Sequence, residues 1–344
     1  MRKLLNTLYV TTPDAYLAKD GLNVVVSVDK EERFRIPIMN VESIVTFGYM
    51  GASPGVMKLC MDNNVSLVFM SPQGRFIGRV QGATKGNVLL RKKQYALSED
   101  ENVALHLAKL FITGKVFNTR SILQRFLRDN GADEEVEYAV KQLDWRKKCI
   151  QQAETMDILR GEEGRAANTY FDVFNHLILH QKEDFSFSGR SRRPPKDEVN
   201  AMLSFVYTLI ANDVAAALES VGLDPYVGFM HTLRPGRTSL ALDMMEELRA
   251  YLGDRLVLSM INRKQVSKRD FIRQGEHGFI MTDDCRKELL STWQKRKKEM
   301  IEHPFLKEKI PIGLLPYTQA MLFARFIRDD LDDYRLSCNS PWMN

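Results

Sequence analysis

The chain has 344 residues, of which 27% are charged and 44% hydrophobic, and its net charge is +5. These values are typical of a globular protein in water, and the length favours two domains. The Cys residues lie far apart without a CxxC pair, which argues against a zinc ribbon and against a disulfide framework. The most apolar stretch, residues 201–218, is interrupted by Asn212 and Asp213, and the start has no credible signal peptide. We therefore expect a cytoplasmic protein that does not enter membranes.

The first ninety or so residues predict a small β-rich domain. Short runs of β-branched or alternating residues are separated by turn-forming sequences, a pattern that indicates hairpins. Ser53 and Pro54 predict the start of a short helix, with Ser53 as its N-cap. The predicted strands are residues 8–10, 23–28, 33–38, 41–46, 65–70 and 76–80. Nothing here looks catalytic, so this part serves association or only stabilises the rest.

From residue 88 onward, apolar residues recur with helical spacing to the end of the chain. The sequence therefore predicts an α+β fold, with a β-rich domain over residues 1–87 and a larger all-helical domain over residues 88–344.

The motif Gly161-Glu162-Glu163-Gly164 stands out within the helical part. Glycine inside a helix costs about 1 kcal/mol relative to alanine, so two of them indicate close approach by another backbone or by a ligand. A glutamate between them could point into a site. The alternative is an ordinary helix start, where acids face the positive end of the helix dipole.

Two stretches are rich in basic residues. The loop over residues 185–197 holds Arg190, Arg192, Arg193 and Lys196, and guanidinium groups bind phosphates with two hydrogen bonds. Residues 286–298 predict a basic amphipathic helix, which suits a membrane surface or a nucleic acid. Without a lipidation signal, nucleic acid is the favoured partner, although basic side chains often only face solvent.

The stretch over residues 228–249 combines a histidine with acidic residues. His231 follows an apolar Gly-Phe-Met step, and Ser239 is placed as the N-cap of a helix. Helical spacing puts Asp243, Glu246 and Glu247 opposite the apolar residues. One interpretation is a solvated helix face. The other is a metal site, since hard divalent ions accept imidazole and carboxylate ligands.

These motifs together resemble one family, the CRISPR-associated endonucleases that integrate new spacers, the first of the numbered Cas proteins. The resemblance covers essentially the whole chain. It includes Gly114-Lys115, residues 161–171, 190–205, 228–231 and 239–246. Residues 302–305 and 310–317 resemble the form found in type I systems of subtype C.

The resemblance implies an enzyme of antiviral defence with a catalytic helical domain. Such an enzyme is a metal-dependent DNA endonuclease that joins protospacer 3′-hydroxyl ends to the CRISPR repeat by transesterification, and it cleaves branched or single-stranded DNA. The family implies a homodimer that binds a small partner, the second numbered Cas protein, in a heterohexameric complex. It also implies Mg²⁺ or Mn²⁺ held by Glu163, His231 and Glu246, with Asp243 as a nearby support.

The resemblance also suggests a path for DNA. Its candidate residues are Tyr170, Arg190, Arg192, Arg193, Lys196, Asn200 and Arg237. Two other functions remain open at this point. One is a metal-dependent nuclease that only hydrolyses DNA, and the other is a DNA-binding scaffold without enzymatic activity. No P-loop, dinucleotide-binding motif or HExxH motif supports a further class of enzyme.

Overall fold

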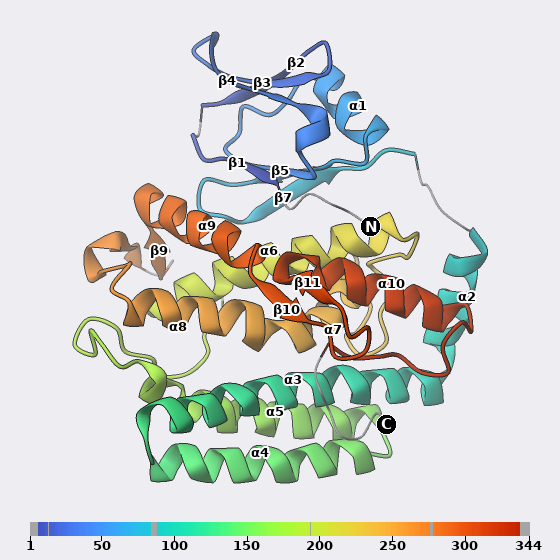
Figure 1. The fold of residues 1–344 in the computed structure, drawn as a ribbon, viewed down its shortest axis with the longest axis vertical. Helices are drawn as coiled ribbons and strands as arrows, with labels where there is room; N and C mark the ends of the chain where they lie inside the picture. Colours follow the sequence, from blue (N-terminus) through green and yellow to red (C-terminus); the bar gives the residue numbers. More distant parts are fainter. Residues whose placement is uncertain (1–5, 13, 84–87, 193, 276–277, 338–344) are drawn as a thin grey trace. The chain divides into compact units, whose positions relative to one another are not determined.

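The computed structural model describes residues 6–12, 14–83, 88–192, 194–275 and 278–337. The chain forms two compact units (Figure 1). The first comprises residues 1–85, 281–299 and 311–314, and the second comprises residues 86–280, 300–310 and 315–344. The predicted α+β class is confirmed, because a β-rich region precedes a helical one. Two later segments nevertheless belong to the first unit, so the units do not follow one cut of the chain.

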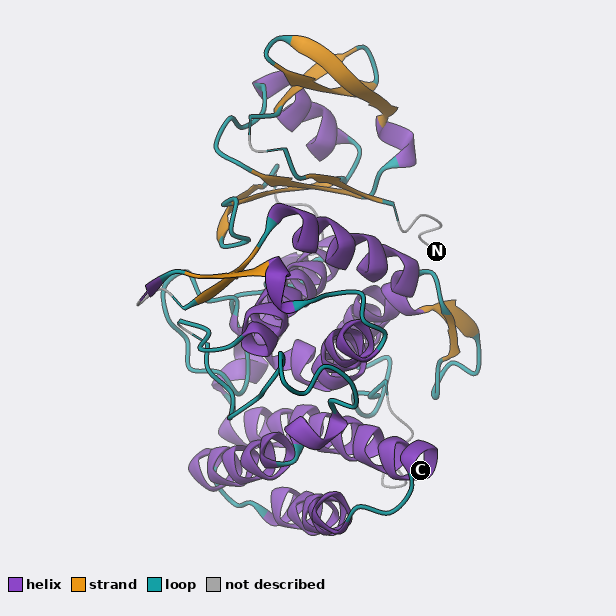
Figure 2. Cartoon of the chain, turned by 90° about the vertical axis from the view of Figure 1, so that its left-hand side faces the viewer, coloured by secondary structure: helices purple, strands orange, loops and turns teal. Residues whose placement is uncertain are grey.

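The first unit contains two sheets with a helix between them (Figure 2). One sheet has the order β1-β5-β6-β7, with β1–β5 and β5–β6 parallel and β6–β7 antiparallel. The other is the antiparallel sheet β2-β3-β4. The strands are β1 (Thr7–Val10), β2 (Tyr16–Asp20), β3 (Asn23–Val28), β4 (Glu31–Pro37), β5 (Ser43–Phe47), β6 (Ser66–Met70) and β7 (Phe76–Val80). Helix α1 (Pro54–Asp62) contacts β2 and β6, and the sides that face it form the core of this unit.

The sequence predictions for this unit hold at most elements. The backbone N–H of Val56 donates to Ser53 Oγ at 3.2 Å, which confirms Ser53 as an N-cap. Strand β2 was not predicted, because Tyr16–Asp20 has no β-branched residue. It forms because β3 offers a complete antiparallel register to it. Helix α9 (Asp283–Lys297) also belongs to this unit, where Gln294 donates to the carbonyl of Thr7 at 3.3 Å.

The second unit is built from helices packed in layers (Figures 1 and 2). Helices α3, α4 and α5 lie side by side, and α7 packs against both α3 and α6. The long helices are α2 (Val88–Glu99), α3 (Glu101–Asn130), α4 (Glu134–Gln152), α5 (Met156–Asp172), α6 (Glu198–Ser220), α7 (Ser239–Leu248), α8 (Arg255–Asn262) and α10 (Leu315–Ile327). A π-helical turn, Arg249–Asp254, joins α7 to α8.

This part of the chain is not entirely helical. Short strand pairs form between β8 (Phe271–Arg273) and β9 (Phe279–Met281), and between β10 (Met300–Glu302) and β11 (Lys309–Pro311). Short helical turns also lie here at η2 (Phe174–Leu177) and η4 (Lys268–Asp270), while η1 (Ile38–Asn40) and η6 (Ile312–Leu314) belong to the first unit.

Helix α6 is the core helix of the second unit. By length and composition alone it could cross a membrane, but two thirds of its most apolar window, 67%, is buried inside the protein. That burial is expected of the central helix of a water-soluble domain. Among the described cysteines, Cys60 and Cys149 are free thiols, and Cys338 lies outside the described residues.

Candidate active site

Three helices bring the two predicted glutamate ligands together around one lysine. Lys115 comes from α3, Glu163 from α5 and Glu246 from α7. The Lys115 ammonium is paired with Oε1 of Glu163 and lies 2.9 Å from Oε2 of Glu246. The Glu163 side chain is 25% exposed and that of Glu246 is 4% exposed. The cluster is therefore deep in the protein on one side and open to solvent on the other.

The close packing of α3 on α7 depends on a glycine. A Cβ at Gly114 would lie 3.0 Å from Cβ of Glu247, so a larger residue here would push the two helices apart. One turn later, Asn118 donates to the backbone carbonyl of Glu247 at 2.6 Å. These contacts hold Lys115 opposite Glu246.

His231 is oriented by Asp243, which is fully buried on α7. The Asp243 carboxylate accepts backbone N–H groups of Phe229 at 2.7 Å, Met230 at 3.1 Å and His231 at 3.0 Å. The imidazole Nδ1 lies 2.6 Å from the same carboxylate, and because a carboxylate can only accept, Nδ1 carries the proton. The lone pair of Nε2 is then free, and the His231 side chain is 20% exposed. Asp243 thus orients the imidazole, and its role as the support of a metal ligand stays a prediction.

Glycine is required just before this turn. A Cβ at Gly228 would lie 2.5 Å from Oδ2 of Asp243 and 2.8 Å from the backbone nitrogen of Leu240. No real side chain fits at those distances. The Gly-Phe-Met-His sequence can therefore wrap around the carboxylate only because its first residue has no side chain.

Two cations keep Glu246 ionised. Arg249 Nη2 lies 2.8 Å from Oε1, and Lys115 faces Oε2. Burial by itself raises the pKa of this carboxyl, but the charges of Arg249 and Lys115 outweigh it and lower the pKa to about 2. The glutamate is consequently a carboxylate at any physiological pH.

The neighbours of the two ligand glutamates have different partners. Glu162 is bound by Arg146 at 3.1 Å and also by Arg165. Glu247 accepts from Tyr334 at 2.5 Å and from the backbone N–H of Ser337 at 2.9 Å. Neither side chain turns toward Lys115. The acidic face of α7 is therefore buried, and its interpretation as a solvated surface is wrong.

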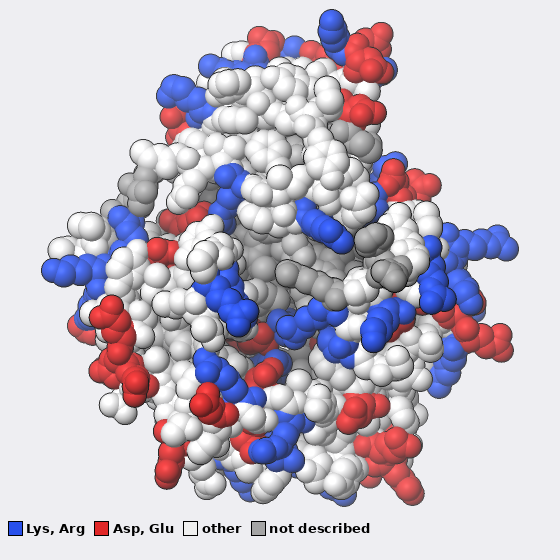
Figure 3. Space-filling model, turned by 180° about the vertical axis from the view of Figure 1, so that it is seen from behind, with Lys and Arg blue, Asp and Glu red and all other residues white. Residues whose placement is uncertain are grey.

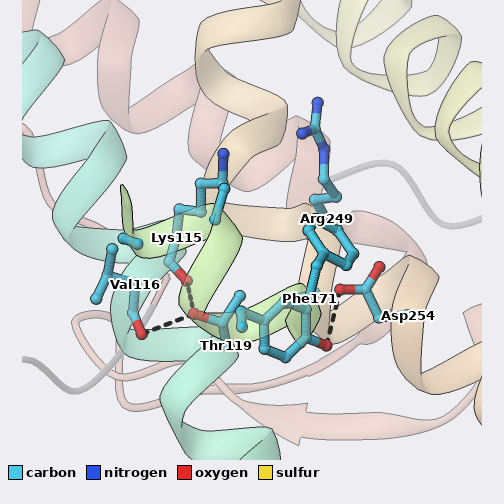
Figure 4. Close-up of a pocket in the computed structure, with 10 residues that line it drawn as sticks. Lys115, Val116, Thr119, Phe171, Arg249 and Asp254 are labelled. Atoms are coloured by element: carbon cyan, nitrogen blue, oxygen red, sulfur yellow. Dashed lines mark hydrogen bonds between the residues drawn. The ribbon is translucent and has the colours of Figure 1, made fainter. Parts of the chain in front are cut away.

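A small cavity of about 20 Å³, room for roughly one water molecule, lies beside Lys115 and Arg249 (Figure 4). Figure 4 shows these two side chains projecting in the same direction from α3 and from the π-helical turn. At the other end of the cavity the buried Asp254 accepts from Tyr170 at 3.0 Å and from Tyr207 at 2.5 Å. Burial raises the pKa of Asp254 to about 6, despite these hydrogen bonds.

The donor types fit a hard divalent ion, although the side chains are not closed around one. Among the residues that the structure describes, no three Asp, Glu, His or Cys side chains converge as a ready metal site. Glu163 and Glu246 instead form ion pairs with Lys115. Within the described chain, Oε2 of Glu246 accepts no hydrogen bond of good geometry. Two carboxylates and a free imidazole nitrogen are a donor set that hard divalent ions accept.

Three of the predicted DNA residues are at least partly exposed at the surface. Arg192 and Lys196 are exposed, and Arg237 is partly exposed. Burial and then the positive charges of Arg234, Arg192 and Arg160 lower the pKa of Arg237, although Asp243 acts the other way. Arg160 Nη2 donates to the carbonyl of Met230 at 2.9 Å, next to His231. Guanidinium groups that repel one another beside the site favour an anionic ligand. Figure 3 shows one face of the protein, on which Lys and Arg side chains are interspersed with Asp and Glu.

Other predicted DNA residues point into the protein. Tyr170 is buried against Asp254, and Asn200 is fully buried in the first turn of α6. Arg190 donates to Asn200 Oδ1 at 2.7 Å and to Ser204 Oγ at 3.1 Å. These contacts favour structural roles, and the role of the three residues in DNA binding stays an untested prediction. Arg193 lies outside the described residues.

Three details differ from the sequence predictions. Thr238, not Ser239, is the N-cap of α7, and Ser239 is the first helical residue. A Cβ at Gly161 or Gly164 would meet nothing within 4 Å, so in the part of the chain that the structure describes no backbone packs against them on that side. On α9, Arg286, Arg296 and Lys297 are buried, which leaves fewer exposed cations than the sequence suggested.

Lys115, Arg249 and Asp254 were not predicted as members of the site. A lysine within the apolar run of residues 111–116 was the signal that could have indicated Lys115. For Arg249 and Asp254, the signal would have been the π-helical turn, which frequently marks functional sites but cannot be read from a sequence.

Comparisons with known proteins show what the whole chain is similar to. The family model described as CRISPR associated protein Cas1 matches residues 8–295. A CRISPR-associated endonuclease Cas1 of Chlorobaculum tepidum is 48% identical over 337 residues, which are 97% of this chain and 98% of the relative. A casposase bound to its integration product has a similar fold, with a TM-score of 0.84, 19% identity and coverage of 97% of this chain and 94% of the casposase. A Cas6-RT-Cas1–Cas2 complex matches with a TM-score of 0.83 and 21% identity, over 96% of this chain and 36% of that one.

Proposed function

The chain belongs to the Cas1 family of CRISPR-associated proteins, and on this basis we propose that it is the integrase of CRISPR adaptation. In this function it is a metal-dependent DNA endonuclease that joins the 3′-hydroxyl ends of a protospacer to the CRISPR repeat. It also cleaves branched or single-stranded DNA with the same site.

One observation supports the assignment most strongly. Glu163 and Glu246 are 83 positions apart in the sequence (246 − 163), yet both carboxylates meet the same ammonium group. His231, the third proposed ligand, is fixed in one tautomer by a buried carboxylate beside them. A scaffold that only binds DNA has no use for a buried acid such as Glu246, whose pKa neighbouring cations hold low.

The proposed cofactor is Mg²⁺ or Mn²⁺, bound by Glu163, His231 and Glu246. Such an ion polarises the phosphorus centre and lowers the pKa of an attacking hydroxyl. His231 is a neutral ligand through Nε2 in this proposal, because Asp243 already holds its Nδ1 proton. It is therefore not a general base.

The proposed reaction is a direct transesterification. The 3′-oxygen of the protospacer forms a bond to phosphorus as the bond from phosphorus to the 3′-oxygen of the repeat strand breaks. The proton lost by the attacking hydroxyl is balanced by the one that the leaving oxygen gains. Arg192, Lys196 and Arg237 bind the phosphates nearby and offset their charge. No protein–DNA covalent intermediate forms.

The partners are proposed from the family and from the titles of similar structures. We propose a homodimer that assembles with Cas2 and DNA into a heterohexamer in the cytoplasm, where the free thiols stay reduced. The Cas1-containing complex that resembles this chain in fold also contains Cas2. Residues 302–305 and 310–317 lead us to propose the subtype C form of type I systems.

An integration assay tests the enzyme as an integrase. The full chain, with and without Cas2, is incubated with a repeat-containing plasmid, a labelled protospacer and Mn²⁺ or Mg²⁺. Glu163→Gln, His231→Ala and Glu246→Gln should each abolish joining. Glu162→Gln is the matched control, because that glutamate adjoins Glu163 but pairs with arginines of the scaffold.

The nucleophile separates the proposal from its alternatives. A protospacer that ends in a 3′-dideoxynucleotide should not be joined, although nicking of branched DNA continues. Nicking without any joining of hydroxyl ends would indicate an enzyme that only hydrolyses DNA. DNA binding without metal-dependent cleavage or joining would indicate a scaffold, and a covalent protein–DNA adduct would exclude direct transesterification.

A further inference from the structure

Lys115 lies at the centre of the site, with its ammonium group between the two proposed carboxylate ligands. It is paired with Glu163 and lies 2.9 Å from Oε2 of Glu246, and its own side chain is 8% exposed. A buried ammonium is stable only when it is paired with opposite charge. Lys115 has two such partners, on two different helices.

The two carboxylates have few partners other than Lys115. Within the described chain, Lys115 is the only hydrogen-bond or ion-pair partner of the Glu163 side chain. Glu246 gives one oxygen to Arg249 and turns the other toward Lys115. The oxygens that face Lys115 are thus the ones without another strong partner. They are also the oxygens that face the interior of the cluster, where a ligand to a shared cation must point.

We propose that Lys115 is a built-in counterion of the metal site. It is a positioning residue that holds the Glu163 and Glu246 side chains together, and a divalent ion takes over the same two oxygens when it binds. The inference rests on the proposed function, because it takes these two glutamates as metal ligands.

Electrostatics gives this arrangement a measurable consequence. Two carboxylates that face one another without a cation repel, and this repulsion destabilises the protein. A cation that already occupies their oxygens repels an incoming metal and must be displaced by it. Loss of the Lys115 charge should therefore weaken the metal-free protein and tighten its hold on the metal.

The experiment uses the full-length chain and Mn²⁺ alone as the probe. Mn²⁺ binding is measured at pH 8 from the electron paramagnetic resonance signal of the free ion, and thermal melting is followed in EDTA and in Mn²⁺. Lys115→Met should lower the Kd for Mn²⁺ by at least about tenfold. Its Tm in EDTA should fall by at least about 3 °C, and Mn²⁺ should raise its Tm by more than it raises that of the wild type.

A second variant keeps the test decisive if Lys115→Met does not fold without metal. Lys115→Met combined with Glu163→Gln removes one charge of each sign from the cluster. This double variant should melt in EDTA within about 2 °C of the wild type, because no uncompensated carboxylate pair remains. A double variant that melts no higher than Lys115→Met alone would show that the two charges do not depend on each other.

Lys147 provides the matched control. It is as buried as Lys115, at 7% side-chain exposure, and its Nζ lies 3.2 Å from Oδ1 of Asp144 on the same helix, α4. Lys147→Met removes a buried, ion-paired lysine that touches neither proposed ligand. Its Kd for Mn²⁺ should equal that of the wild type.

Failure of this inference can be told apart from failure of the proposed function. If Glu246→Gln abolishes Mn²⁺ binding but Lys115→Met leaves the Kd within threefold of the wild type, or raises it, the site stands and the counterion role of Lys115 is overturned. If Glu246→Gln binds Mn²⁺ as the wild type does, the proposed ligand set itself is wrong.

Discussion

Asp243→Asn should disrupt the turn that carries His231. Each carboxylate oxygen of Asp243 accepts two hydrogen bonds: Oδ2 from the N–H groups of Phe229 and Met230, and Oδ1 from the N–H and Nδ1–H of His231. A carboxamide has one oxygen, so two of the four donors must face its NH₂ group. Hydrogen bonds to a charged group contribute about 1.5–3 kcal/mol each, so we expect the free energy of unfolding to fall by about 3–6 kcal/mol.

The same variant should also weaken metal binding, because the imidazole loses the group that fixes its tautomer. Loss of such a partner typically costs about 10–100-fold in affinity. Urea unfolding in EDTA and Mn²⁺ binding measure the two effects. Asp197→Asn is the control, since this buried acid caps α6 through the backbone N–H of Asn200 at 2.7 Å and does not contact His231. An Asp243→Asn protein with wild-type Mn²⁺ affinity and stability within about 1 kcal/mol would refute the reasoning.

Three further predictions concern the same unit. Gly228→Ala should lower the free energy of unfolding by about 3 kcal/mol, because its Cβ would collide with the backbone of α7; urea unfolding near the wild-type value would contradict this. Asp254 has a pKa of about 6 when folded, above the ordinary 3.8, so its contribution to stability is present below about pH 4 and is lost as the pH rises through 6. The shift corresponds to about 3 kcal/mol. The free energy of unfolding of the wild type, relative to that of Asp254→Asn, should therefore fall by that order between pH 4 and 7. A difference that stays constant with pH would argue against a buried charge. Arg192→Ala together with Arg237→Ala should flatten the dependence of DNA affinity on salt by about 0.9 in log–log slope for each phosphate that the variant no longer binds, and fluorescence anisotropy titrations that give an unchanged slope would place both residues away from DNA.

Local patterns were enough to predict much of the fold. The strand over residues 23–28 and the helix that starts at Pro54 were both readable, because β-branched runs and an N-cap act within a few residues. Strand β2 was not readable, since its stability comes from pairing with β3 rather than from its own side chains. The π-helical turn after α7 depends in the same way on contacts that no short window of sequence contains.

Some residues of the site could be predicted from the sequence and others could not. The order of motifs predicted Glu163, His231 and Glu246 as ligands. The structure joins the two glutamates through Lys115 and places His231 where its charge acts on Glu246, while their role as ligands stays a prediction. Spacing alone could not decide whether the acidic face of α7 meets solvent or protein, because an amphipathic pattern is compatible with both. Likewise, Arg190 looks like its basic neighbour Arg192 in the sequence. Only the tertiary structure shows that Arg190 bonds Asn200 while Arg192 is exposed.

In the pairs Glu162-Glu163 and Glu246-Glu247, the other acid of each pair cannot replace the proposed ligand. Consecutive residues of an α-helix point about 100° apart, so each pair sends one carboxylate to Lys115 and the other to the scaffold. An insertion of one residue upstream within α5, or a deletion of one residue upstream within α7, would put the scaffold acid in the place of the ligand and turn the ligand away from the site. Evolution of this chain can therefore exchange surface residues of these helices far more freely than it can change the number of residues that precede each ligand.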